Sequence, residues 1–360
     1  MDFFGRPKAD APAPSKTDKQ SDAKDAAAAR LVPWVEKYRP RNINEVTAQD
    51  EVVRVLRKSL ETKNLPHLLF YGPPGTGKTS TILALTRDMY GAEAKTRVLE
   101  LNASDERGIS VIREKVKNFA RGAIATSSAA RSSMPPYKVI ILDEADSMTS
   151  DAQAALRRII EKYSRVTRFC LVCNYVSRII EPLASRCTKF RFKSLPRDQA
   201  IARVAEVARL ENVGCRDDAV GALVDCAEGD LRRAMMSLQS ASRMVGSSGK
   251  QLDAAVVAEV VGVIPSDVVA QLRDSWGAAD TSAVCGLVDQ LVYSGYPASR
   301  VLSQLHDLVV DDERLSSLQK SKIAILMAST DKALHDGADE QLQLLDLMLQ
   351  ASKVAVQQAA

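Results

Sequence analysis

The segment Gly72-Pro-Pro-Gly-Thr-Gly-Lys-Thr79 limits the fold more than any other feature, because it satisfies the phosphate-binding loop pattern in full. An apolar run, 67–71, precedes it, and a helical pattern, 79–89, follows it. A strand, a glycine-rich loop and a helix in this order direct backbone N–H groups toward the β- and γ-phosphates of a nucleotide. Lys78 would add a positive charge, and Thr79 would offer a hydroxyl group to Mg²⁺. A glycine–proline turn that matched by chance would not have a strand and a helix in register, so the sequence predicts an α/β nucleotide-binding domain.

Apolar runs alternate with helical patterns between residues 31 and 195, and this alternation predicts the sheet. The runs are continuously apolar, which is typical of parallel strands covered by helices on both faces. They comprise residues 67–71, 98–101, 138–142, 168–173 and 189–192. Cys170 and Cys173 lie three apart on one run, so their side chains should point to opposite faces and form no metal or redox site.

Polar residues end two of these runs. Asp143 and Glu144 follow the run 138–142, at the edge where open α/β sheets bind ligands. Asp143 would hold Mg²⁺ through water, and Glu144 would orient and deprotonate the attacking water. Asn174 ends the next run; alone it is an ordinary strand-end residue. If its strand lies beside the strands at 67–71 and 138–142, Asn174 becomes a candidate to hold the attacking water.

Composition divides the chain into four parts. Residues 1–30 contain only three large apolar residues and predict a disordered tail. Residues 31–195 form the predicted α/β domain. From residue 196 onward the strand runs stop. Helical patterns at 197–211, 216–227, 231–245 and 253–261 predict one small helical domain at 196–262, and further helices predict a second at 263–356.

Charge is distributed unevenly, although the net formal charge is only +4. Residues 151–194 carry ten Lys and Arg against three Asp and Glu, whereas 265–360 carry seven against thirteen. The first region favours a polyanion and the second repels one, unless both are simply solvated surfaces. An aromatic content of 5% disfavours a single-strand binder built on base stacking. No run of about 18 apolar residues is present, so we expect no membrane span, and the six cysteines should be free thiols.

Several motifs resemble those of replication factor C small subunits, which are AAA+ ATPases of the sliding-clamp loader. They are Phe70-Tyr-Gly-Pro-Pro-Gly-Thr-Gly-Lys-Thr-Ser80, Leu101-Asn-Ala-Ser-Asp-Glu-Arg-Gly108, Ile141-Leu-Asp-Glu-Ala-Asp146, Phe169-Cys-Leu-Val-Cys-Asn174, Leu183-Ala-Ser-Arg-Cys187 and Gly229-Asp-Leu-Arg-Arg233. The resemblance covers about 31–354, and the stretches 33–40 and 301–306 are most similar to a eukaryotic small subunit. It implies an α/β P-loop AAA+ domain with a parallel sheet, then a helical lid domain and an all-α C-terminal collar domain that mediates oligomerisation.

The resemblance also implies roles for individual residues. Val35 and Arg39 match the adenine end of the nucleotide pocket, and Asn174 matches sensor 1. Arg232 matches sensor 2, with Arg233 as its competitor. Arg186 matches the arginine finger that acts on the neighbouring subunit's ATP, although a solvated loop arginine is the simpler interpretation. The full implied nucleotide site comprises Val35, Arg39, Gly72, Pro73, Pro74, Gly75, Thr76, Gly77, Lys78, Thr79, Ser80, Asn174 and Arg232.

A basic stripe is expected on the helix after the second strand. Ser104 has the properties of a helix start, which would place Arg107 in the first turn. Arg113, Lys117 and Arg121 then follow at intervals of four; such a stripe is usually a solvated helix face. The resemblance implies instead that Arg107, Arg113, Lys117 and Arg178 contact DNA phosphates without reading the bases.

By resemblance, the chain is an ATPase subunit of a heteropentameric loader that uses ATP and Mg²⁺. The loader opens a ring-shaped sliding clamp and places it on primer–template DNA during replication and repair, in the nucleus. Two alternatives stay open. A non-hydrolysing scaffold is opposed by Glu144 and Asn174, and a hexameric translocase is opposed by the lack of an aromatic pore-loop candidate near 102–111.

Overall fold

The computed structural model describes residues 32–104, 109–122, 134–246, 251–277 and 281–356, and it divides into two compact units. The first unit contains residues up to 212 together with 227–239, and the second contains 213–226 together with 240–360. The predicted tail, 1–30, lies outside the described residues. The predicted domain boundaries after 195 and 262 stay predictions.

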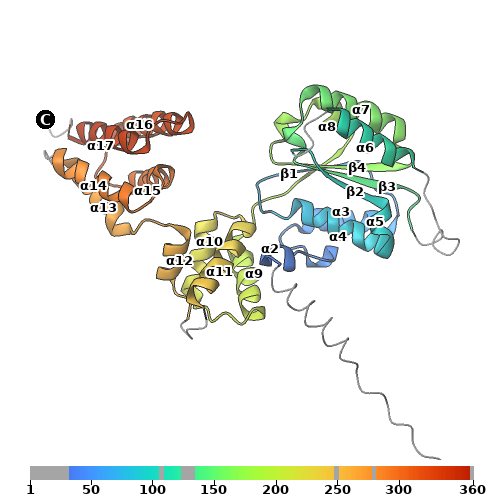
Figure 1. Ribbon diagram of the computed structural model, residues 1–360, viewed down its shortest axis with the longest axis horizontal. Coiled ribbons are helices and arrows are strands. Elements are labelled where there is room, and N and C mark those ends of the chain that lie inside the picture. The colour runs from blue at the N-terminus through green and yellow to red at the C-terminus, as the bar shows by residue number, and fades with distance from the viewer. Residues whose placement is uncertain (1–31, 105–108, 123–133, 247–250, 278–280, 357–360) are drawn as a thin grey trace, which may run out of the picture. The chain divides into compact units, whose positions relative to one another are not determined.

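A five-stranded sheet forms the centre of the first unit, with all paired strands parallel (Figure 1). Its strands lie in the order β2–β3–β4–β1–β5. Their bounds are β1 Leu68–Tyr71, β2 Val98–Asn102, β3 Lys138–Asp143, β4 Thr167–Cys173 and β5 Thr188–Arg191. Each predicted run coincides with one strand to within one residue at either end. The prediction of a parallel sheet is therefore confirmed.

Helices cover both faces of this sheet (Figure 1). On one face lie α3 (Asp50–Glu61), α4 (Lys78–Tyr90) and α5 (Ala94–Arg97). On the other lie α6 (Ile109–Arg121), α7 (Ser150–Tyr163) and α8 (Glu181–Ala184).

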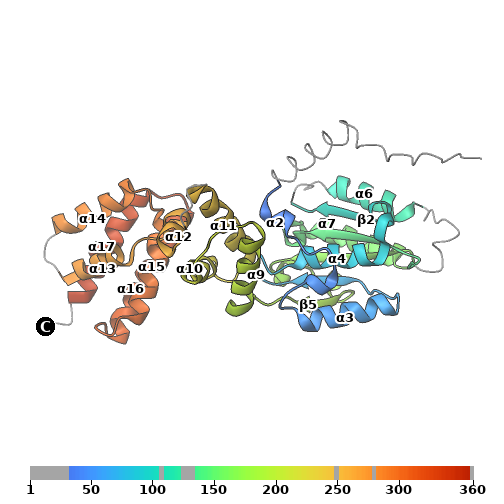
Figure 2. The same cartoon turned by 90° about the horizontal axis from the view of Figure 1, so that it is seen from below.

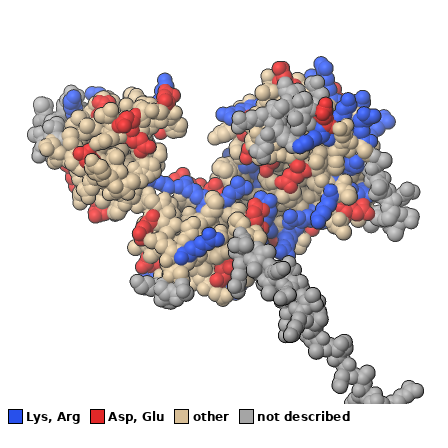
Figure 3. All heavy atoms as spheres, in the orientation of Figure 1, with Lys and Arg blue, Asp and Glu red and all other residues tan. Residues whose placement is uncertain are grey.

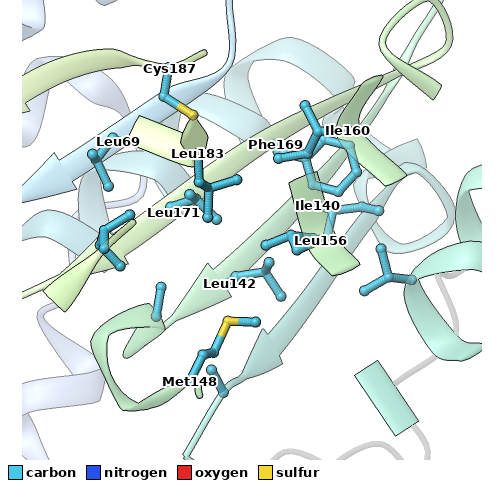
Figure 4. Close-up of a cluster of buried hydrophobic side chains, with 14 of the residues drawn as sticks. Leu69, Ile140, Leu142, Met148, Leu156, Ile160, Phe169, Leu171, Leu183 and Cys187 are labelled. Carbon is cyan, nitrogen blue, oxygen red and sulfur yellow. The ribbon is translucent and has the colours of Figure 1, made fainter. Parts of the chain in front are cut away.

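Alternation along the strands explains why the runs are continuously apolar, because successive side chains enter opposite layers. Ile140 and Leu142 of β3 pack with Leu156 and Ile160 of α7 (Figure 4), whereas Val139 and Ile141 belong to the core on the α3 and α4 side.

The two cysteines of β4 follow the same alternation. Cys173 belongs to the core beside α7, and Cys170 belongs to the opposite core. The prediction that these two side chains point to opposite faces of the sheet is confirmed. All six cysteines are free, as expected.

Several short elements occur along the described chain, and longer helices make up most of the part after β5. The short ones are α2 (Trp34–Lys37) and the 3-10 turns Ile43–Glu45, Gly91–Glu93, Ala145–Ser147, Val176–Arg178 and Ser275–Gly277. The later helices are α9 (Arg197–Leu210), α10 (Asp217–Ala227), α11 (Leu231–Val245), α12 (Ala254–Val261), α13 (Ser266–Asp274), α14 (Thr281–Tyr293), α15 (Ala298–Asp311), α16 (Ser317–His335) and α17 (Glu340–Val356). The first four of these match the predicted helical patterns 197–211, 216–227, 231–245 and 253–261 within two residues.

The second unit has its own apolar core, formed by helices α13 to α17 (Figure 2). Trp276 is buried within it, and its indole N–H lies 3.5 Å from the Met348 sulfur. Ser316 and Gln319 form a capping box at the start of α16. Within the described parts of the chain, no helix is both long and apolar enough to cross a membrane.

Two glycines of the phosphate loop make a matched test of backbone strain. Gly72 has φ +147°, and a Cβ there would lie 2.2 Å from the Phe192 carbonyl oxygen; Gly77 has φ +88°, and its Cβ would meet nothing within 4 Å. We expect Gly72→Ala to lower the free energy of unfolding by about 3 kcal/mol, because both strain and a backbone clash oppose it. Gly77→Ala should cost about 1 kcal/mol, from strain alone. Urea denaturation without nucleotide measures both, and equal losses would contradict the clash.

Candidate functional site

A pocket opens where the carboxyl ends of the central strands meet the phosphate loop, and residues of the first unit alone line it. Many of these residues were predicted from the sequence, namely Val35, Arg39, Pro74, Gly75, Thr76, Gly77, Lys78, Thr79, Ser80, Asp143, Glu144, Asn174 and Arg232. Gly72 and Pro73 do not line the pocket; their carbonyl groups accept hydrogen bonds from Lys78 instead. The structure therefore brings almost all of the predicted nucleotide residues together.

Lys78 is the charged centre of this pocket. It is the first residue of α4, preceded by Gly77 in the left-handed conformation. Its Nζ donates to the carbonyl oxygens of Gly72 and Pro73, both at 2.8 Å, and to Asn174 Oδ1 at 2.9 Å. Burial lowers the pKa of this ammonium group, and the negative charge of Asp143 opposes that shift. An ammonium ion held by neutral oxygens in this way attracts a polyphosphate strongly.

Thr79 and Asp143 supply the oxygen atoms that suit Mg²⁺. The Thr79 hydroxyl donates to Asp143 Oδ2 at 2.9 Å, and the Glu144 N–H donates to Asp143 Oδ1 at 2.9 Å. Hydroxyl and carboxylate oxygens are the ligands that Mg²⁺ prefers, and this ion usually keeps several waters. The donor set therefore fits the ion. Glu144 adopts a left-handed backbone conformation, with φ +52°, and its exposed side chain borders the pocket.

Asn174 follows β4, and β4 lies between β3 and β1. This arrangement meets the condition set by the sequence, because Asn174 now shares an edge of the sheet with Asp143 and the phosphate loop. Its backbone N–H donates to Asp146 Oδ2 at 3.1 Å. Asp146 belongs to the motif Ile141–Asp146, which by itself predicted no role for this residue.

Arg232 reaches the pocket because α11 begins against the phosphate loop. A Cβ on Gly75 would lie 1.8 Å from Asp230 Oδ1, so only glycine allows this approach. The same carboxylate oxygen accepts from the Arg233 N–H at 3.2 Å. Arg232 lines the pocket and Arg233 does not, so of the two only Arg232 is placed to contact a ligand in the pocket.

The end of the pocket near α2 contains residues that the sequence did not identify. They are Tyr38, Pro40, Glu45, Val46, Thr47, Leu195, Arg203, Leu231 and Met235. The Arg203 guanidinium donates to the Tyr38 carbonyl oxygen at 3.0 Å and pairs with Glu206 at 2.7 Å. Aliphatic side chains from α11 beside a polar rim suit an adenine ring. They come from three separate stretches of the chain, 38–47, 195–203 and 231–235, so no single local pattern could have grouped them.

Arg186 does not line the pocket. Its guanidinium lies 2.6 Å from Glu161 Oε1 and donates to the Pro182 carbonyl oxygen. Arg157 also pairs with Glu161, at 3.2 Å. Both Arg186 and Glu161 are exposed, so Arg186 is available at the surface of the first unit.

The structure describes the side chains of only some of the predicted DNA-binding residues. Arg107 lies outside the described residues, as does the predicted first turn after Ser104; the described helix α6 begins at Ile109. Arg113 belongs to α6, but its side chain is likewise outside the described part. Lys117 is exposed on α6, and Arg178 is exposed with its guanidinium 5.2 Å from the centre of the Tyr175 ring. Figure 3 shows Lys and Arg side chains gathered on the part of the surface formed by the first unit.

Comparison with known proteins identifies the same two regions. Residues 68–195 match the family model "ATPase family associated with various cellular activities (AAA)", and residues 264–350 match "Replication factor C C-terminal domain". Among solved structures, a RuvB variant of Thermotoga maritima has a TM-score of 0.51, with 17% identity over 74% of this chain and 90% of that chain. At this identity, the likeness supports the fold alone.

Curated relatives are much more similar. Replication factor C subunit 2 of Saccharomyces cerevisiae is 51% identical, covering 89% of this chain and 93% of the relative. Replication factor C subunit 4 of Homo sapiens is 53% identical, covering 89% and 87%. Replication factor C small subunit 1 of Pyrobaculum arsenaticum is 45% identical, covering 88% and 92%.

These matches confirm the predicted resemblance, the AAA+ fold class with a helical C-terminal region, and the assignment to P-loop ATPases that work within a multi-subunit complex. The chain belongs to the replication factor C small-subunit family of AAA+ ATPases.

Proposed function

We propose that this chain hydrolyses ATP as one subunit of a clamp loader, a heteropentamer that opens a ring-shaped sliding clamp and places it on primer–template DNA in the nucleus. One observation carries the ATPase part of the proposal. Groups from three adjacent strand ends converge, with Thr79 2.9 Å from Asp143 and Lys78 2.9 Å from Asn174. Family membership supports the remaining parts.

Several residues of the pocket have distinct tasks in this proposal. Lys78 and the phosphate-loop N–H groups bind the β- and γ-phosphates, and Arg232 approaches the γ-phosphate from α11. Thr79 and Asp143 would hold Mg²⁺, which neutralises phosphate charge when bound. Glu144 takes the proton of the attacking water, and Asn174 orients that water.

Glu144→Gln should leave ATP binding intact and slow hydrolysis at this site by about 10²–10⁴-fold, because the amide cannot accept the proton of the attacking water. Single-turnover hydrolysis in the reconstituted complex, with nucleotide affinity measured in parallel, tests the assignment. Lys78→Ala is the contrasting variant, since it should weaken nucleotide binding itself. Unchanged turnover in Glu144→Gln would show that another group is the base.

Arg186→Ala should spare nucleotide binding by this chain and suppress hydrolysis at the site of the adjacent subunit. An arginine supplied in trans raises turnover by a factor on the order of 10³–10⁵. Arg186→Lys should restore little of the hydrolysis at the adjacent site, because an ammonium group cannot reproduce the planar fork of the guanidinium. The assay is a mixed complex in which only the adjacent site retains its phosphate-loop lysine.

Arg157→Ala is the matched control for this experiment, because Arg157 pairs with the same carboxylate, Glu161. It should leave turnover at the adjacent site unchanged. Normal turnover there with Arg186→Ala would leave Arg186 as a solvated loop residue.

Arg113→Ala should weaken primer–template binding equally for all DNA sequences, because the proposed contact is with a phosphate. Loss of one phosphate contact lowers the slope of log K against log salt by about 0.9 on duplex DNA. Lys58→Ala on α3 is the control, since this exposed lysine lies on the helix layer at the opposite face of the sheet. An unchanged slope, or a loss that depends on the DNA sequence, would contradict phosphate contact by α6.

A further inference from the structure

Asp146 connects the acidic turn after β3 to the end of β4. Its Oδ2 accepts hydrogen bonds from two consecutive backbone N–H groups, those of Asn174 and Tyr175, both at 3.1 Å. These groups lie just beyond the last residue of β4, Cys173, so the carboxylate replaces the partners that a neighbouring strand would supply.

Hydrogen bonds between its own residues stabilise the turn that carries Asp146. Glu144 has a left-handed backbone, and its carbonyl oxygen accepts from the Ser147 N–H at 2.9 Å and from the Ser147 hydroxyl at 2.7 Å. Asp146 itself is half-buried. The turn therefore presents the carboxylate from a fixed position, one strand away from the backbone that it binds.

A second group holds the far end of the same segment. Gln153 of α7 is 1% exposed; its Oε1 accepts from the Ile180 N–H at 2.8 Å, and its Nε2 donates to the Arg178 carbonyl oxygen at 3.0 Å. The segment 174–180 is thus held at two separate places. Loss of Asp146 should release only the end that contains Asn174.

We infer that Asp146 is a positioning residue for Asn174: by fixing the Asn174 and Tyr175 N–H groups, it sets where the Asn174 amide lies beside the phosphate site. The Asn174 side chain is 2.9 Å from Lys78 Nζ, so a small backbone shift at residue 174 would move the amide away from the position where it orients water. The inference rests on the proposed catalytic function of Asn174.

The first measurement needs no nucleotide. In Asp146→Ala, hydrogen exchange of the Asn174 and Tyr175 amides should accelerate about tenfold or more, while the Ile180 amide, bound by Gln153, stays protected. Asp151→Ala is the matched control, because Asp151 is an exposed carboxylate in the first turn of α7 that does not line the pocket. It should leave exchange at all three amides unchanged. Unchanged exchange at residues 174 and 175 in Asp146→Ala overturns the inference.

The second measurement is a kinetic double-mutant cycle in the reconstituted complex, with this site as the only one able to hydrolyse ATP. Asp146→Ala should lower turnover by about 10- to 100-fold with little change in nucleotide affinity. Combined with Asn174→Ala, it should add no further loss, because the two residues act as one unit. Additive losses would assign Asp146 a separate role and overturn the inference.

Asp146→Asn distinguishes hydrogen bonding from charge, and it also guards against misfolding of the alanine variant. The amide oxygen still accepts from both N–H groups, so turnover should stay within a few-fold of the parent protein. A loss as large as that of Asp146→Ala would show that the charge itself is required, which overturns the inference. If Asn174→Ala has normal turnover, the proposed function of Asn174 fails and the inference with it; if only Asp146→Ala has normal turnover, the inference alone fails.

Discussion

The hydrogen-bonded order β3–β4–β1 is the constraint on which the nucleotide site depends. Because the strands are parallel, the residues that follow their carboxyl ends meet at one edge of the sheet. One additional strand between β4 and β1 would add about 4.8 Å, and the 2.9 Å contact between Lys78 and Asn174 would be lost. The same order brings Asp143 to the Thr79 hydroxyl. The pairing of strands that are buried and apolar thus determines the distances between the polar groups of the site.

Gly75 of the phosphate loop also allows the start of α11 to lie close to the loop. Gly75 leaves no room for a Cβ beside Asp230, the residue before α11. The loop is therefore close enough to α11 for Arg232 to line the same pocket as Lys78. The absence of a side chain at residue 75 thus serves two purposes, since the backbone can approach phosphate on one side and the start of a helix on the other.

Local patterns in the sequence predicted the strands, the helices from 197 to 261 and most of the phosphate site, because each rests on neighbouring residues. Strands buried on both faces are apolar throughout, and the phosphate loop is contiguous. Asp146 was missed because its contact depends on the left-handed backbone at Glu144 and on the strand order. Tyr38 and Arg203 were missed because tertiary packing brings them to the pocket. The helix start expected at Ser104 lies next to residues that the structure does not describe.

Two kinds of contact hold the chain between Asn174 and Arg186, and their strengths differ. The buried Gln153 binds backbone groups of Arg178 and Ile180, so that part of the segment is fixed by bonds that are costly to break. Arg186 is held by Glu161 in an ion pair whose side chains are 37% and 41% exposed, and exposed pairs of this kind contribute little to stability. The backbone that carries Arg186 is therefore well defined, whereas its guanidinium can leave Glu161 at little cost. In the proposed trans role, the phosphate group on an adjacent subunit would offer more negative charge than one carboxylate. It would take the guanidinium from Glu161 without any rearrangement of the fold.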